Sequence, residues 1–141
     1  MKRYSIEHIG ICVTQPVEMA HWYRDVLGFN IKLEGQDSEK GVAFITDADD
    51  RVMLEFGKVP NVDPLCEKTD HYLQLHIALK SDDPDKEAEY LVSKGATYIE
   101  KYAITLPGGE HLIALRDPWG NTIQLARRKS EKGELEKKLQ I

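Results

Sequence analysis

Cysteine is scarce in this sequence: Cys12 and Cys66 are the only two among 141 residues, and they form no Cys-x-x-Cys pair. Small secreted domains held by disulfides are much richer in cysteine, so the sequence favours free thiols in a reducing compartment. Long apolar runs are also missing, because no stretch approaches the roughly 20 residues of a membrane-spanning helix. No apolar segment follows the basic start Met-Lys-Arg, as it would in a signal peptide. We therefore expect a cytoplasmic protein with no membrane partner.

An excess of positive charge is absent as well. The 19 Lys and Arg residues face 24 Asp and Glu residues, for a net charge of −5, which argues against nucleic acid as a partner. With 41% hydrophobic and 30% charged residues the composition is that of an ordinary globular chain, and its length suits a single domain at 1–128. The charged tail at 129–141 carries Leu135 and Leu139 one helical turn apart, which predicts a surface helix.

The hydrophobic pattern predicts a strand, a helix and three strands, and then the same order again. In module one, at about 5–57, we expect a helix from Pro16 to Gly28 and strands at 5–13, 29–33, 42–46 and 51–57. A linker at about 58–71 precedes module two, at about 72–127, with a helix from Pro84 to Gly95 and strands at 72–79, 97–102, 111–116 and 121–127. The predicted fold class is α+β: two tandem βαβββ modules forming a curved, barrel-like mixed sheet with the helices outside.

The spacing of matching features supports the repeat. His8 and His76, both in first strands, are 68 residues apart, and the helix-ending Gly28 and Gly95 are 67 apart. Polar residues in the last strands, Glu55 and Gln124, are 69 apart. Agreement within two residues among three separate landmarks indicates a duplicated unit.

Four polar residues occupy equivalent positions of the two modules. His8 and His76 lie in the first predicted strands, and Glu55 and Gln124 lie in the last ones, on faces that are otherwise apolar. If the two sheets curl toward one another, two imidazoles, one carboxylate and one amide oxygen converge. Such a set suits one divalent metal of the Ni, Co or Zn kind, with Mn also accepted.

Each residue alone has a simpler interpretation. A single histidine on a strand is more often a core or rim residue than a ligand, and a single glutamate more often lies on a solvated sheet face. That interpretation gives no reason for polar residues at matching positions in both modules, so the repeat favours the metal. His21, His71 and His111 have no such counterpart and are expected at the surface or in loops. Cys12, on the His8 face, is expected to fill a pocket wall rather than act as a nucleophile.

Four segments carry a family resemblance: IEHIGICV, WYRDVLGF, LQLHIAL and DPWGNTIQL. They resemble the vicinal oxygen chelate superfamily, which includes glyoxalase I, methylmalonyl-CoA epimerase, fosfomycin-resistance enzymes, extradiol dioxygenases and bleomycin-binding proteins. The resemblance covers residues 5–127. It implies paired βαβββ modules, usually in a homodimer, that bind a small-molecule substrate. It also implies a metal held by His8, Glu55, His76 and Gln124.

Within this resemblance the closest match is glyoxalase I, a lactoylglutathione lyase. The implied reaction is isomerisation of a hemithioacetal, or of a similar small molecule with vicinal oxygens, through an enediolate. Glu55 is the implied catalytic base, because the amide of Gln124 is too weak a base for that role. Glyoxalase I enzymes of bacteria typically have arginine at the position of Cys12 and asparagine shortly after that of Glu55, where this chain has Phe-Gly-Lys-Val-Pro. The thiol cosubstrate is therefore open.

Two alternatives remain. Read from the second module to the first, the ligand order is His76, Gln124, His8, Glu55, which is similar to the residue types of methylmalonyl-CoA epimerase. A non-catalytic, bleomycin-type binding protein is the alternative from another class, although such proteins lack the ligand set. Fosfomycin-type transferases and extradiol dioxygenases have glutamate in the last strand, so Gln124 argues against both.

Overall fold

The computed structural model of the chain describes residues 1–35, 41–65 and 71–128. The chain divides into two compact units, Met1–Asp70 and His71–Ile141, and the boundary falls inside the linker expected at about 58–71. The tail expected as a surface helix at 129–141 lies outside the described residues, as do 36–40 of the first module and 66–70 of the linker. Within the described residues, no helix is long and apolar enough to cross a membrane.

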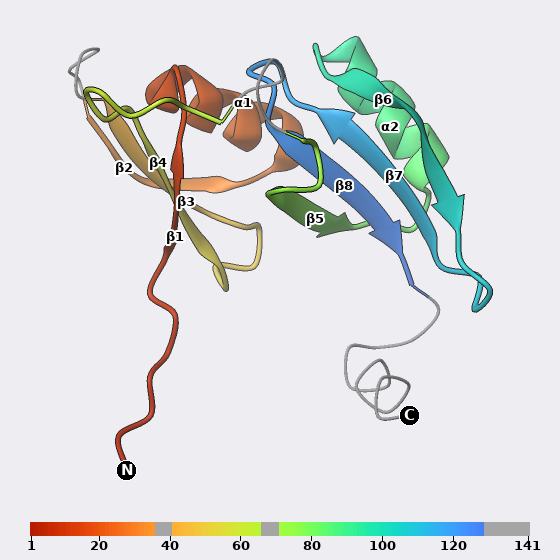
Figure 1. Cartoon of the computed structure of the whole chain (residues 1–141), viewed down its shortest axis with the longest axis horizontal. Coiled ribbons are helices and arrows are strands. Elements are labelled where there is room, and N and C mark those ends of the chain that lie inside the picture. Colours follow the sequence, from red (N-terminus) through yellow and green to blue (C-terminus); the bar gives the residue numbers. More distant parts are fainter. Residues whose placement is uncertain (36–40, 66–70, 129–141) are drawn as a thin grey trace. The chain divides into compact units, whose positions relative to one another are not determined.

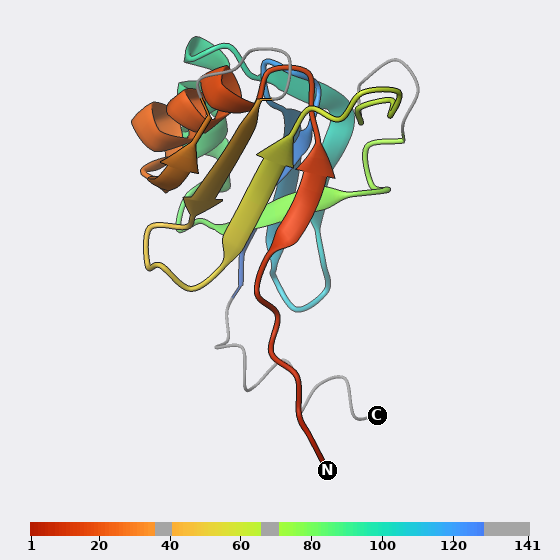
Figure 2. The same cartoon turned by 90° about the vertical axis from the view of Figure 1, so that its left-hand side faces the viewer.

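The first unit is a four-stranded mixed sheet covered by one helix (Figure 1). Its strand order is β1-β4-β3-β2, with β1 parallel to β4 and the other neighbours antiparallel. Figure 2 shows β1 and β4 side by side and pointing the same way. The elements are β1 (Ile9–Cys12), α1 (Pro16–Leu27), β2 (Asn30–Glu34), β3 (Val42–Thr46) and β4 (Met53–Gly57).

Helix α1 begins and ends where its sequence predicts. Pro16 stands in the first turn, where its missing N–H costs no hydrogen bond, and Gly28 ends the helix with a left-handed φ of 74°. The buried face of α1 includes Tyr23, which is fully buried and makes edge-on ring contacts with Phe29 at 5.6 Å and Phe56 at 5.1 Å. These aromatic contacts fix the helix on one face of the sheet.

The second unit repeats this plan, with the strand order β5-β8-β7-β6 and β5 parallel to β8. Helix α2 covers one face of the sheet, starting from an Asp83 side chain that accepts a hydrogen bond from the Lys86 N–H and burying Ala88 and Leu91 (Figure 1). The elements are β5 (His76–Lys80), α2 (Pro84–Ser93), β6 (Thr97–Thr105), β7 (His111–Arg116) and β8 (Thr122–Arg127).

The predicted α+β class and the two βαβββ modules are confirmed. The described residues form two open four-stranded sheets rather than closed barrels. The first strands are also shorter than predicted, since β1 starts at Ile9 and β5 at His76. Ile9 pairs with Leu54, the second residue of β4, and His76 pairs with Thr122, the first residue of β8. Residues before 8 and before 76 therefore have no strand to pair with. Residues 72–74 form a turn instead of a strand.

Candidate functional site

The strand register places the four candidate ligands at equivalent positions of the two units. Gly10 of β1 pairs with Glu55 of β4, and Ala78 of β5 pairs with Gln124 of β8. His76, the first residue of β5, is two residues before Ala78. His8, which directly precedes β1, is two residues before Gly10. Side chains two residues apart on a strand share a face, so each histidine has its polar partner as a diagonal neighbour.

The pair in the first unit is His8 and Glu55. His8 Nε2 lies 3.6 Å from Glu55 Oε2, and the two side chains are 36% and 34% exposed. The His8 ring meets Phe44 edge-on, with centroids 5.4 Å apart, which limits how the imidazole turns. Methyl groups at Gly10 and Gly57 would stand only 3.7 and 3.6 Å from Glu55 Oε1. Because glycine has no side chain, Gly10 and Gly57 leave one side of the Glu55 carboxylate uncovered.

The pair in the second unit is His76 and Gln124. His76 is exposed, and its Nδ1 lies 3.3 Å from the carbonyl oxygen of Leu73. Gln124 is 6% exposed and pairs in register with Ala78 on one side and Ala114 on the other. Both in-register neighbours of Gln124 are small, as Gly10 is beside Glu55. Gln124 therefore has the same register position as Glu55, but it is much less exposed.

The donor atoms of the first pair fit a divalent metal. Imidazole nitrogen and carboxylate oxygen bind such ions at about 2.0–2.2 Å, so one ion can contact two atoms that are 3.6 Å apart. The described residues contain no group of three or more His, Cys, Asp and Glu side chains arranged to hold a metal. The structure thus brings His8 and Glu55 together in the first unit. It relates His76 and Gln124 by strand register in the second unit, and the single four-residue site stays a prediction.

The environment of His8 raises its pKa above the usual value. The main cause is a hydrogen bond from His8 Nδ1 to the Glu7 carboxylate; partial desolvation opposes it, and the negative charges of Glu7 and Glu55 add to it. Glu7 did not appear among the predicted site residues, because strand alternation would turn it to the opposite face from His8. Residues before Ile9 are not in the strand, so the Glu7 side chain reaches the neighbouring ring.

We expect Glu7→Gln to lower the pKa of His8 toward the ordinary value of about 6.5, since it removes the charged acceptor but keeps an amide in its place. In the wild-type chain the raised pKa keeps His8 protonated up to a higher pH than an ordinary histidine. A proton on Nε2 excludes a metal from that atom, so proton competition also extends to higher pH. The measurement is an NMR titration of the ring resonances in metal-free protein. The other four histidines serve as internal controls, and an unchanged His8 midpoint would contradict the assignment.

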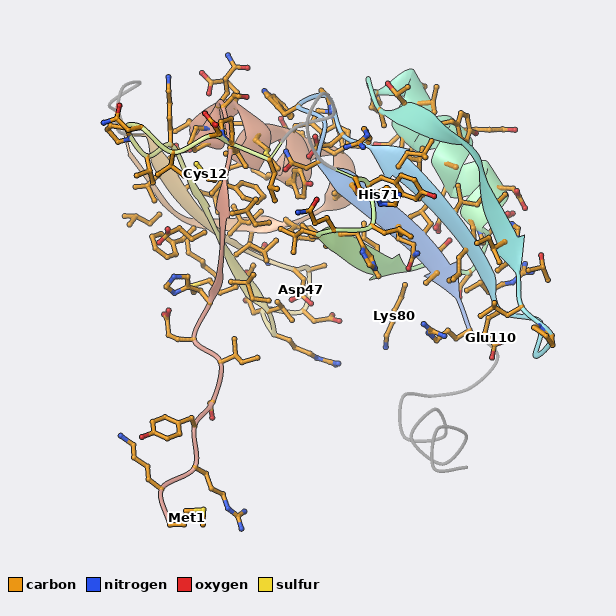
Figure 3. The ribbon with its side chains drawn as sticks, in the orientation of Figure 1. Met1, Cys12, Asp47, His71, Lys80 and Glu110 are labelled. Atoms are coloured by element: carbon orange, nitrogen blue, oxygen red, sulfur yellow. The ribbon has the colours of Figure 1, made fainter. Side chains whose placement is uncertain are left out.

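Cys12, labelled in Figure 3, is the last residue of β1 and lines a cavity of about 490 Å³. The thiol lies 3.8 Å from the Val62 carbonyl oxygen, to which it donates. The wall is mostly apolar, with the thiol, one hydroxyl, one amide and the Lys58 ammonium as its polar side-chain groups. Residues 12–14 form one side, and Lys58, Val59, Pro60, Asn61, Val62 and Pro64 form the other. None of the four candidate ligands lines this cavity, so a place for Cys12 in the wall of a metal pocket stays a prediction.

The remaining histidines have other partners. His21 Nε2 is 2.7 Å from the Glu34 carboxylate, and His71 stacks on Tyr72 at 4.4 Å. The expectation for His111 is wrong, because its side chain is only 12% exposed on β7. It lies between Thr105, 3.0 Å from Nδ1, and Asp85, 3.4 Å from Nε2, so it connects α2 to the β6–β7 hairpin.

Several solved structures share the fold over nearly the whole chain. A glyoxalase family protein from Bacillus cereus matches with a TM-score of 0.71 at 15% identity, covering 90% of this chain and 95% of its own. A glyoxylase/bleomycin resistance protein/dioxygenase domain from Frankia sp. EAN1pec matches with a TM-score of 0.64 at 18% identity, over 95% and 99% of the two chains. A glyoxalase/bleomycin resistance protein/dioxygenase family enzyme from Burkholderia phytofirmans PsJN has the same score at 16% identity, over 88% and 98%.

No curated protein matches the chain in sequence. The structural likenesses, all below 25% identity, establish the fold. A family model matches residues 5–125, which include all four candidate ligands. This chain belongs to the Glyoxalase/Bleomycin resistance protein/Dioxygenase superfamily.

Proposed function

We propose that the chain is a divalent-metal-dependent, glyoxalase I-like lyase or isomerase of a small molecule with vicinal oxygens, such as a hemithioacetal. One observation carries the proposal: His8 and Glu55 meet in the first unit, and the strand register puts His76 and Gln124 at the same two positions of the second. A duplicated fold gives no structural reason for polar residues at both. A shared ligand set does.

His8, Glu55, His76 and Gln124 would hold the metal, with Ni, Co or Zn expected and Mn acceptable for this nitrogen and oxygen set. When bound, the metal would act as a Lewis acid that polarises the substrate's oxygens. We propose a homodimer as the assembly. Protein purified without chelator should contain about one such metal per chain, and metal-free protein that rebinds none would contradict the proposal.

Glu55 is proposed as the catalytic base. It is the one carboxylate in the ligand set, and Gln124 at the equivalent position has no strongly basic lone pair. One side of Glu55 faces Gly10 and Gly57, where no larger side chains of these strands block the approach of a substrate. The carboxylate would take a proton from one substrate carbon and return it to the neighbouring carbon, so no redox partner is required.

We propose that the cavity beside Cys12 takes the thiol half of the substrate. Cys12 is four residues after His8, and at about 3.3 Å per strand residue this places the cavity about 13 Å along the strand. The lining has mostly apolar groups and one cation, Lys58. Glutathione carries two carboxylates and an ammonium group, which this wall does not match. We propose a thiol with at most one carboxylate, or a substrate with an apolar group in its place.

A second candidate is an epimerase of the methylmalonyl-CoA type. It would use the same base and ligand set, and the observation that favours it is the amide rather than a second carboxylate at position 124. A non-catalytic binding protein of the bleomycin type is the third, and the paired His8 and Glu55 argue against it, because binding alone requires no metal ligands.

A turnover screen tests the three candidates together. Methylglyoxal is offered with glutathione, bacillithiol or a small uncharged thiol, each with Ni, Co and Zn, and methylmalonyl-CoA is offered with the same metals. We expect metal-dependent turnover of a hemithioacetal, faster with the small thiol than with glutathione. Epimerisation alone would favour the second candidate. Ligand binding with no turnover under any metal would favour the third.

A further inference from the structure

Both candidate histidines use the same ring nitrogen for a contact within their own unit. His8 Nδ1 contacts the Glu7 carboxylate, and His76 Nδ1 lies 3.3 Å from the Leu73 carbonyl oxygen. The two partners differ in kind, since one is a side chain and the other is main chain. Both are acceptors without a hydrogen to donate.

This chemistry determines which nitrogen carries the lone pair. A neutral imidazole has one N–H, and a carboxylate or carbonyl partner places that hydrogen on Nδ1. Nε2 is then left as the acceptor or metal-binding atom. In the first unit, His8 Nε2 is the atom 3.6 Å from Glu55 Oε2. With neutral His8, two lone-pair-bearing atoms face each other there, which is an arrangement that a cation stabilises.

Different local structures produce the same contact in the two units. Glu7 reaches His8 because the chain before Ile9 is outside the sheet and exposed, with the Glu7 side chain 75% exposed. Leu73 O reaches His76 because the chain makes a turn before β5, held by a 2.9 Å hydrogen bond from Gln74 N–H to the His71 carbonyl. The same Nδ1 contact thus arises from two different local structures at equivalent positions. This points to a shared requirement for the contact in both units.

We propose that Glu7 and the Leu73 carbonyl are positioning groups that hold His8 and His76 with the hydrogen on Nδ1 and so direct Nε2 to a metal. The inference rests on the proposed function for its metal. The tautomer itself can be measured without metal. Histidine ligands elsewhere use such contacts, and loss of one typically weakens metal affinity about 10- to 100-fold.

The test is long-range ¹H–¹⁵N NMR of the rings in the metal-free full chain, at a pH where all histidines are neutral. We expect the Nδ1–H form for both residues in the wild type. Glu7→Leu, which removes the acceptor at similar size, should release His8 from this form and leave His76 unchanged. Glu7→Gln keeps a carbonyl acceptor, so His8 should keep the Nδ1–H form in this variant. Leu73→Ala is the matched control, because it keeps the main-chain carbonyl and should leave His76 as it is.

Zinc titration of the same proteins supplies the second readout. Glu7→Leu should bind zinc about 10-fold more weakly than Glu7→Gln. An unchanged His8 tautomer in Glu7→Leu would overturn the inference, and so would equal zinc affinities of the two variants. If the wild type binds no zinc, nickel or cobalt, the proposed function fails, and with it the role of these contacts toward a metal. The tautomer spectra would still show separately whether Glu7 and Leu73 orient the rings.

Discussion

Glu55→Gln should reduce turnover by about 10²- to 10⁴-fold, the range that a general base typically contributes, with the fold unchanged. Glutamine keeps the size of the side chain and one oxygen that can contact a metal. It lacks the negative charge and the basic lone pair that take a proton from carbon. The loss should therefore appear in kcat at saturating metal rather than only in metal affinity, and steady-state kinetics across metal concentrations measure both.

Gln124→Ala is the matched comparison, because it alters the equivalent position of the second unit. It should weaken metal binding, and excess metal should restore most of the rate, since no proton transfer is assigned to the amide. Glu34→Gln controls for loss of a surface carboxylate near His21 and should leave turnover unaltered. Full activity of Glu55→Gln would show that the base assignment is wrong.

Sequence reasoning succeeded where local chemistry decides the structure. Gly28 and Gly95 were predicted to end the helices, and both have left-handed backbone, with φ of 74° and 105°. The predicted strands at 111–116 and 121–127 are joined by a turn, in which the Asp117 carboxylate accepts from the N–H groups of Trp119 and Asn121 at 2.9 Å. Together with the 67- to 69-residue offsets, such features were enough for the βαβββ repeat.

Sequence reasoning failed where the structure of a segment depends on another segment that pairs with it or contacts it. Where β1 and β5 begin depends on how far β4 and β8 extend, which the pattern of β1 or β5 alone does not contain. The contact from Glu7 to His8 exists because the chain has left the strand before that point. His111 was expected at the surface or in a loop because it has no counterpart in the other module. Its contacts come from β6 and α2, and no sequence signal links these elements to it.

Phe56→Ala should destabilise the first unit by about 3–5 kcal/mol, as for other fully buried aromatic residues. Phe56 is 0% exposed on β4, directly after Glu55 and on the opposite face of the strand. Its ring contacts Tyr23 of α1 at 5.1 Å, and truncation would leave a cavity between helix and sheet. Denaturant unfolding followed by fluorescence measures the loss. Leu33→Ala, at a site that is 57% exposed, should change stability by less than about 0.5 kcal/mol.

The same substitution links the core to the candidate site. Phe56 holds the strand that carries Glu55, so a loosened β4 should widen the distribution of distances between Glu55 and His8. Phe56→Leu keeps most of the apolar volume, and we expect it to lose less stability and less metal affinity than Phe56→Ala. If Phe56→Ala lost stability but kept wild-type metal affinity, the core would not be what holds Glu55 in place. The position of the carboxylate would then have to depend on β1 and β3, the two strands that pair with β4.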